Sequence, residues 1–154
     1  MKKVLYLLFA ATVFFACGNG ANKKTNTSAQ TESIVETNVV SNPDHIEVLY
    51  FHGAQRCITC RAIEKHTKEL LDSLYSTEMA NGTIVYKTID ISQKENQAIA
   101  DKYEVTWSSL FINKWDNGKE QPNNMTEYAF SYAKGQPDTF KTGIKDKIEE
   151  LKNK

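Results

Sequence analysis

The feature that most constrains the fold is a pair of cysteines between a short apolar strand and an amphipathic helix. Residues 46–52 (I-E-V-L-Y-F-H) are aromatic and β-branched and end at Gly53, which predicts a buried strand. From Cys57 the apolar residues recur every three or four positions, which predicts a helix as far as about Tyr75. The motif that begins at Cys57 and ends at Cys60 therefore opens the first helix of the domain.

The remaining patterns alternate between strand and helix. We expect strands at 83–91 and 109–115, a helix at 92–103, a hairpin turn at 116–118, a partner strand at 128–132 and a last helix from Pro137. Ser92 and Glu95 have the spacing of a capping box at the start of the second helix. This order of elements predicts an α/β fold, a three-layer sandwich with a mixed central sheet of about four strands between helices.

Charge and composition exclude several classes of protein. The 154 residues include 19 basic and 19 acidic side chains, so the formal net charge is zero. A neutral chain has no general attraction for a polyanion, and we expect no nucleic-acid partner. Three cysteines are too few for a disulfide-dense scaffold. The length suits one ordinary domain.

The N-terminus has the pattern of an export signal. Residues 1–16 combine two lysines with thirteen apolar or small residues. As a helix this run spans ~20 Å, which is short of the ~30 Å hydrocarbon core of a bilayer. Residues 14–17 (F-F-A-C) resemble a bacterial lipobox, with Phe14 in place of the usual leucine. We expect a lipoprotein signal peptide at 1–16 and lipidation of Cys17; the alternative is a plain signal peptide with a cysteine nearby.

The next segment differs in composition from the domain that follows it. Residues 17–44 are rich in Asn, Ser, Thr, Lys and Gln and contain no aromatic residue. Such a segment buries too little apolar surface to offset its conformational entropy. We therefore expect a lipidated N-terminus and flexible tether at 17–44 and a folded domain at 45–154. The protein would be lipid-anchored in the bacterial cell envelope, facing the periplasm.

The two cysteines of the motif are predicted to be unequal. Cys57 lies at the helix N-terminus, where the macrodipole and free backbone N–H groups stabilise a thiolate. Cys60 lies one turn further, on the apolar stripe, and is shielded. Thiol–disulfide exchange requires this inequality, because an exposed thiolate attacks and a second thiol resolves the mixed disulfide. A structural disulfide is the alternative, although closing a four-residue loop stabilises by only about 2 kcal/mol.

Three neighbours of the motif carry groups that suit a redox or a metal site. His52 ends the first strand, and Arg56 and Arg61 add positive charge on either side of the motif. In the redox interpretation they tune the two thiols, and no cofactor beyond the Cys57–Cys60 disulfide is needed. In the alternative interpretation Cys57, Cys60 and His52 bind a soft metal or metalloid such as copper, zinc or arsenic.

Beyond these residues, the sequence resembles the thioredoxin fold over about residues 45–152. The resemblance rests on the strand 48–51, the Cys57–Cys60 motif and the segments 89–90, 100–105 and 109–112. Residues 51–64 resemble more narrowly the thioredoxin-like (ArsF-type) subunit named for nitrophenyl compound nitroreductase systems. The resemblance implies a thiol–disulfide oxidoreductase acting on a protein thiol or disulfide. It also implies a membrane electron donor of the DsbD/CcdA type.

Three positions depart from the thioredoxin pattern. Arg56 stands where typical thioredoxins have tryptophan before the first cysteine, and Phe51 stands where they have a buried carboxylate. The proline that borders the dithiol in that family aligns with Ser108 or Ser109. The resemblance therefore implies that these serines face the dithiol. Trp107, beside them, is a candidate substrate contact, and packing in the core or on the sheet face is the alternative.

Overall fold

The sheet is built around β1 (His45–His52), a strand whose central residues are buried on both faces. The computed structural model describes residues 42–154, so the predicted signal peptide, the predicted lipidation of Cys17 and most of the predicted tether lie outside the described residues. Among the residues that are described, no helix is long and apolar enough to cross a bilayer.

The sheet has four strands in the order β2-β1-β3-β4, with β2 at Ile84–Asp90, β3 at Ser109–Asp116 and β4 at Lys119–Gln121. β1 is parallel to β2 and antiparallel to β3, and β4 is antiparallel to β3. A parallel pair needs a crossover connection, which α1 (Ile58–Leu74) and α2 (Ser76–Ala80) provide. The predicted α/β sandwich with a mixed sheet of about four strands is confirmed.

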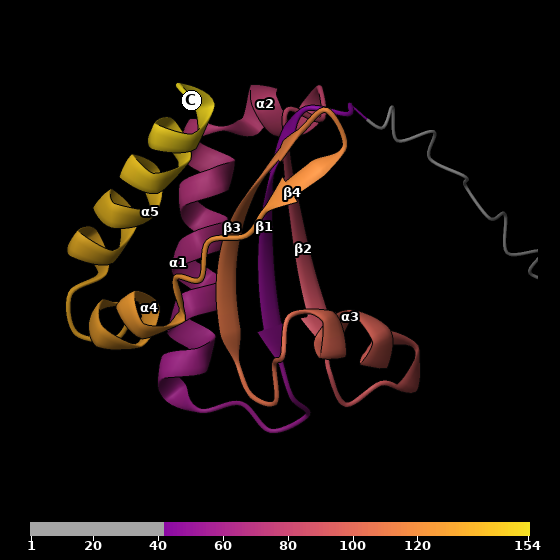
Figure 1. The fold of residues 1–154 in the computed structure, drawn as a ribbon. Helices are drawn as coiled ribbons and strands as arrows, with labels where there is room; N and C mark the ends of the chain where they lie inside the picture. The colour runs from indigo at the N-terminus through magenta and orange to yellow at the C-terminus, as the bar shows by residue number, and fades with distance from the viewer. Residues whose placement is uncertain (1–41) are drawn as a thin grey trace, which may run out of the picture. The chain divides into compact units, whose positions relative to one another are not determined.

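Two cores of unequal size lie on the two faces of the sheet. Figure 1 shows the helices that cover these faces. Alternate residues of β1 point to opposite faces, as the pleat requires. The larger core is formed with α1, α4 (Thr126–Tyr132) and α5 (Pro137–Lys152), and includes Val48, Tyr50, Ile63, Leu71, Ile112, Phe140, Ile144 and Ile148. The smaller core is formed with α3 (Gln97–Lys102) and consists of Leu49, Phe51, Ile89, Ala100, Val105 and Phe111.

The strand predicted at 128–132 is wrong, because these residues belong to helix α4. β3 pairs instead with the three-residue β4, across a turn in which Asn117 and Gly118 both have positive φ. Beyond β4 the chain follows β3, and the Leu110 carbonyl accepts from the Met125 amide at 2.8 Å. The segment then forms a helix, because helical spacing places Ala129 and Ala133, one turn apart, on the same face, where both pack in the large core.

The second predicted helix begins later than its capping-box pattern indicates. The Asp90 carboxylate accepts hydrogen bonds from the Ser92 amide at 2.9 Å and from the Ser92 hydroxyl at 2.6 Å. Ser92 is therefore held in a turn at the end of β2 and does not cap a helix. A short 3₁₀ turn, η1 (Lys94–Asn96), leads into α3. The last helix, α5, begins at Pro137 as expected.

Candidate redox site

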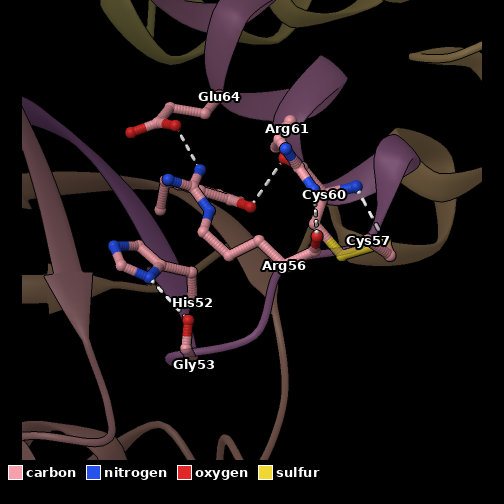
Figure 2. The surroundings of a disulfide bond; sticks show 8 residues. His52, Gly53, Arg56, Cys57, Cys60, Arg61 and Glu64 are labelled. Atoms are coloured by element: carbon pink, nitrogen blue, oxygen red, sulfur yellow. Dashed lines mark hydrogen bonds and ion pairs between the residues drawn. A yellow bond between two sulfur atoms is a disulfide. The ribbon is translucent and has the colours of Figure 1, made fainter.

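The two cysteines of the motif form a disulfide bond at the start of α1 (Figure 2). Their Cα atoms are 5.0 Å apart. Cys57 is the N-cap of the helix, and its sulfur accepts a hydrogen bond from the Cys60 amide at 3.0 Å. Cys57 is exposed, whereas only 7% of the Cys60 surface is exposed. An incoming sulfur can therefore reach Cys57 and not Cys60.

The position of Cys57 follows from the local sequence. β1 ends at His52, and residues 53–57 reverse the chain so that α1 packs back on the sheet. No acidic side chain lies in the first turn of α1. The positive end of the helix macrodipole is therefore not offset by a carboxylate of that turn, which favours negative charge on the Cys57 sulfur.

A network of polar contacts on the large-core face supports the segment that carries the dithiol. The hydroxyl of Tyr50, which is fully buried, donates to the Cys60 carbonyl at 2.7 Å. The Arg56 guanidinium lies 5.5 Å from the centroid of the Tyr50 ring and pairs with the Glu64 carboxylate. Burial opposes the charge of Arg56, but the hydrogen bonds with Glu64 and Tyr50 outweigh it and raise the pKa of the guanidinium. The loop that carries Cys57 is thereby tied to β1 and to α1.

The other two predicted tuning residues lie on either side of this network. The Arg61 guanidinium donates to the Arg56 carbonyl at 3.1 Å and is exposed. The His52 ring contacts the Gly53 carbonyl through Nδ1 at 3.0 Å and lies 5.9 Å from the Tyr50 ring. Figure 2 shows the Arg56 side chain between the His52 ring and the disulfide. Arg61 is thus held at the loop backbone, and His52 lies across Arg56 from the sulfurs.

The metal interpretation requires Cys57, Cys60 and His52 to lie close enough together to bind one ion. Within residues 42–154, no group of three or more His, Cys, Asp or Glu side chains is placed to hold a metal ion. In particular, His52 does not join Cys57 and Cys60 in such a group.

The segment 107–109 leads into β3 at the same end of the sheet as the C-terminal end of β1, which is followed by the dithiol. Ser109 is paired with Phe51 in the β1–β3 register. Ser108 and Ser109 are both buried, and the Ser109 hydroxyl donates to the Trp107 carbonyl at 3.2 Å. Trp107 is 60% exposed, and its ring stacks on Phe130 with centroids 5.2 Å apart. The fold therefore brings the segment to the dithiol end of the sheet.

Phe51, at the position where thioredoxins have a carboxylate, is fully buried in the small core. Its ring lies 5.3 Å from that of Tyr103 and 5.8 Å from that of Phe111. Polar support comes instead from Tyr50, which donates to the Cys60 carbonyl, and from Glu64, which pairs with Arg56. Sequence reasoning identified neither. Glu64 follows Cys60 by one helical turn, a spacing that places both on one face and was a usable signal.

The sequence matches no protein-family model and no curated protein. A solved structure described as that of a malarial protein is 16% identical, with a TM-score of 0.37, over 56% of this chain and 93% of its own. Thioredoxin-2, described as a component of the malaria parasite's protein secretion machinery, is 19% identical, with a TM-score of 0.37, over 53% of this chain and 70% of its own. Similarities of this size do not bear on chemistry, so the fold class rests on the strand order and directions above.

Proposed function

We propose that the chain is a thiol–disulfide oxidoreductase of the cell envelope, with Cys57 as its nucleophile and Cys60 as its resolving thiol. The observation that supports this most is the inequality of the two sulfurs. Cys57 is exposed at the start of α1, and Cys60 is 7% exposed beneath it. An exposed, ionisable sulfur with a shielded sulfur in bonding reach is the arrangement that disulfide exchange uses.

In the reducing direction, the Cys57 thiolate attacks one sulfur of a substrate disulfide. The substrate S–S bond breaks, a mixed disulfide forms, and the first substrate thiolate leaves and takes up a proton. Cys60 then loses its proton and attacks the Cys57 sulfur, which releases the second substrate thiol. The substrate gains two electrons and two protons, and the chain is left with the Cys57–Cys60 disulfide. The same steps in reverse oxidise a substrate dithiol.

The proposed setting is the outside of a bacterial membrane. Cleavage before Cys17 and lipidation of that residue would anchor the domain through the polar segment 17–44. A membrane electron donor of the DsbD/CcdA type would return the disulfide to the dithiol, and a protein thiol or disulfide would be the substrate. The export pattern of residues 1–16 supports the compartment, because disulfide chemistry persists outside the cytosol.

The test is to trap the mixed disulfide in cells that express the full chain. Cys60→Ser leaves the exposed nucleophile without a resolving thiol, so we expect covalent adducts that disappear on reduction. Cys57→Ser is the matched control and should form no adducts, because Cys60 is shielded. A Cys17→Ser version of each variant excludes adducts through the first cysteine. A Cys60→Ser chain that stays free, or equal trapping by both variants, would contradict the proposal.

A further inference from the structure

A groove with a volume of about 720 Å³ lies between the segment that precedes β3 and helix α4. Trp107, just before β3, and Ser109, at its start, line one side, and Glu127 and Phe130 of α4 line the other. Figure 1 shows α4, the start of α1 and the turn before β3 at the same end of the sheet. The groove therefore lies at the dithiol end, next to the position where Ser109 pairs with Phe51.

This end of the molecule exposes apolar side chains that the cores do not use. Among residues 42–154, the exposed large apolar side chains are Ile58, Trp107 and Leu74, and Leu74 lies at the other end of α1. Ile58, which is 70% exposed, lies between the two cysteines, and Trp107, which is 60% exposed, forms a wall of the groove. Two exposed apolar side chains at the dithiol end of the sheet, one of them within the motif, are available to a bound substrate.

The charged side chains of the groove are all acidic. Glu104 and Glu127 line it, and no lysine or arginine does. Neither carboxylate has an ion-pair partner in the part of the chain that the structure describes. By contrast, Glu47, Glu69 and Glu120 are all paired with lysines. Two carboxylates beside an aromatic face attract a cation.

Glu104 also holds an unusual backbone conformation, with φ of 54°. Glycine or asparagine adopts this left-handed region more easily than glutamate does. This conformation ends α3, where the Val105 amide donates to the Ala100 carbonyl at 3.0 Å, and it leaves the Glu104 side chain exposed beside the groove.

We propose that this groove takes a cationic side chain, arginine or lysine, of the polypeptide substrate that docks on the dithiol. The proposal rests on the proposed function and specifies its substrate class. The stacked rings of Trp107 and Phe130 supply the aromatic face, and Glu104 and Glu127 supply the opposite charge. Substrate segments with a basic residue near the reacting cysteine are then preferred over neutral or acidic ones.

The test measures this preference with the full chain in its reduced state. The probes are synthetic peptides with one internal disulfide that differ only in carrying Arg, Gln or Glu, with the variable residue moved along the peptide. We expect kcat/KM for the best Arg peptide to exceed that for its Glu counterpart by about tenfold. The double variant Glu104→Gln/Glu127→Gln should abolish the preference, and Trp107→Ala should lower kcat/KM for the Arg peptide by about fivefold.

Glu95→Gln is the matched control, because it removes an exposed carboxylate that does not line the groove. This variant should keep the full preference. If wild-type protein shows no preference for Arg at any position, or if the preference survives the double variant, the proposed binding of a cationic side chain in this groove is wrong. Reduction of hydroxyethyl disulfide, which carries no charge, reports separately whether the dithiol is active.

A binding measurement keeps the groove testable even if the dithiol proves inert. In a Cys57→Ser/Cys60→Ser chain that also carries Trp115→Phe, the fluorescence of Trp107 reports on the groove. Titration with the Arg peptide, its cysteines replaced by serine, should change that fluorescence at lower concentration than titration with the Glu peptide. Equal curves would overturn the inference. Unequal curves with no hydroxyethyl disulfide reduction would uphold the groove and contradict the proposed oxidoreductase activity.

Discussion

The two faces of β1 differ sharply at the end that carries the dithiol. Tyr50 points to the large-core face, where its hydroxyl donates to the Cys60 carbonyl. Phe51, the next residue, points to the small-core face and packs against the rings of Tyr103 and Phe111, which also contact each other. Polar contact with the dithiol therefore comes from the face covered by α1, and the other face is closed by aromatic packing.

The difference shows how the dithiol is supported when no carboxylate is buried beside it. On the α1 face, the Arg56 guanidinium, paired with Glu64, lies over the Tyr50 ring, and the Tyr50 hydroxyl donates to the Cys60 carbonyl. The buried Tyr50 side chain therefore anchors both the loop before Cys57 and the first turn of the helix. On the α3 face, a charged group would have no such partners. We expect the two faces to respond differently to substitution, and the following tests run from the largest effect to the smallest.

The strongest test places a carboxylate on the apolar face by the substitution Phe51→Asp. The charge would be fully buried among aromatic rings, so we expect the free energy of unfolding at pH 7 to fall by at least about 4 kcal/mol. Phe51→Leu, the control, should cost about 1 kcal/mol because it keeps the site apolar. Denaturant unfolding measures both. A Phe51→Asp chain as stable as the control would refute the apolar character of this face.

Tyr50→Phe tests the polar face with the loss of a single oxygen. The Cys60 carbonyl would lose its buried donor, so we expect the disulfide-bonded form to lose about 1 kcal/mol of stability. Tyr132→Phe removes a hydroxyl that makes no hydrogen bond within residues 42–154, and it should be nearly neutral. Equal losses in the two variants would show that the contact with Cys60 carries no special weight.

The Arg56–Glu64 pair is the next test, because both side chains are more buried than those of an ordinary surface pair. Their exposed fractions are 23% and 30%, against 62% and 50% for Lys68 and Asp72, which lie on the same helix as Glu64. A double-mutant cycle with Arg56→Met and Glu64→Gln should give a coupling free energy of about 1 kcal/mol. The corresponding cycle on Lys68 and Asp72 should give about 0.3 kcal/mol. Equal couplings would contradict a special role for the first pair.

The smallest effect is expected at the end of β2, where Asp90 pairs with His52 in the β1–β2 register. Hydrogen bonds from the Ser92 hydroxyl and amide hold the pKa of Asp90 below the ordinary value of 3.8 for an aspartate. Since the folded pKa is the lower one, the stabilisation is present above pH 4 and is lost as the pH falls through the folded pKa. Asp90→Asn should therefore lower stability at pH 6, and this deficit should shrink in acid. A deficit independent of pH would contradict the assignment.

Much of the fold was predictable because its elements have clear periods. β1, α1 and α5 were located from apolar spacing, and the turn at Asn117-Gly118 from its residues. The residues at 128–132 were misassigned because an aromatic pentapeptide suits a strand, and only packing against the large core makes it a helix. Ser92 was misassigned because Asp90, at the end of β2, competes for it.

In the candidate site, the two cysteines could be predicted from the sequence, but the residues that hold them in place could not. Cys57 and Cys60 are marked by their spacing at a strand-to-helix junction. The contact of Tyr50 with the Cys60 carbonyl joins residues ten positions apart through tertiary packing, which no local pattern records. The groove beside Trp107 depends in the same way on the helix α4, which the sequence pattern did not indicate.

The inequality of the two sulfurs is measured most directly by alkylating the fully reduced full chain with iodoacetamide across a range of pH. Mass spectrometry of the digested protein gives a separate rate for each cysteine. We predict that at neutral pH Cys57 reacts at least about tenfold faster than Cys60, since it is exposed at the helix start. Equal rates for the two cysteines over the whole range would contradict the proposed chemistry.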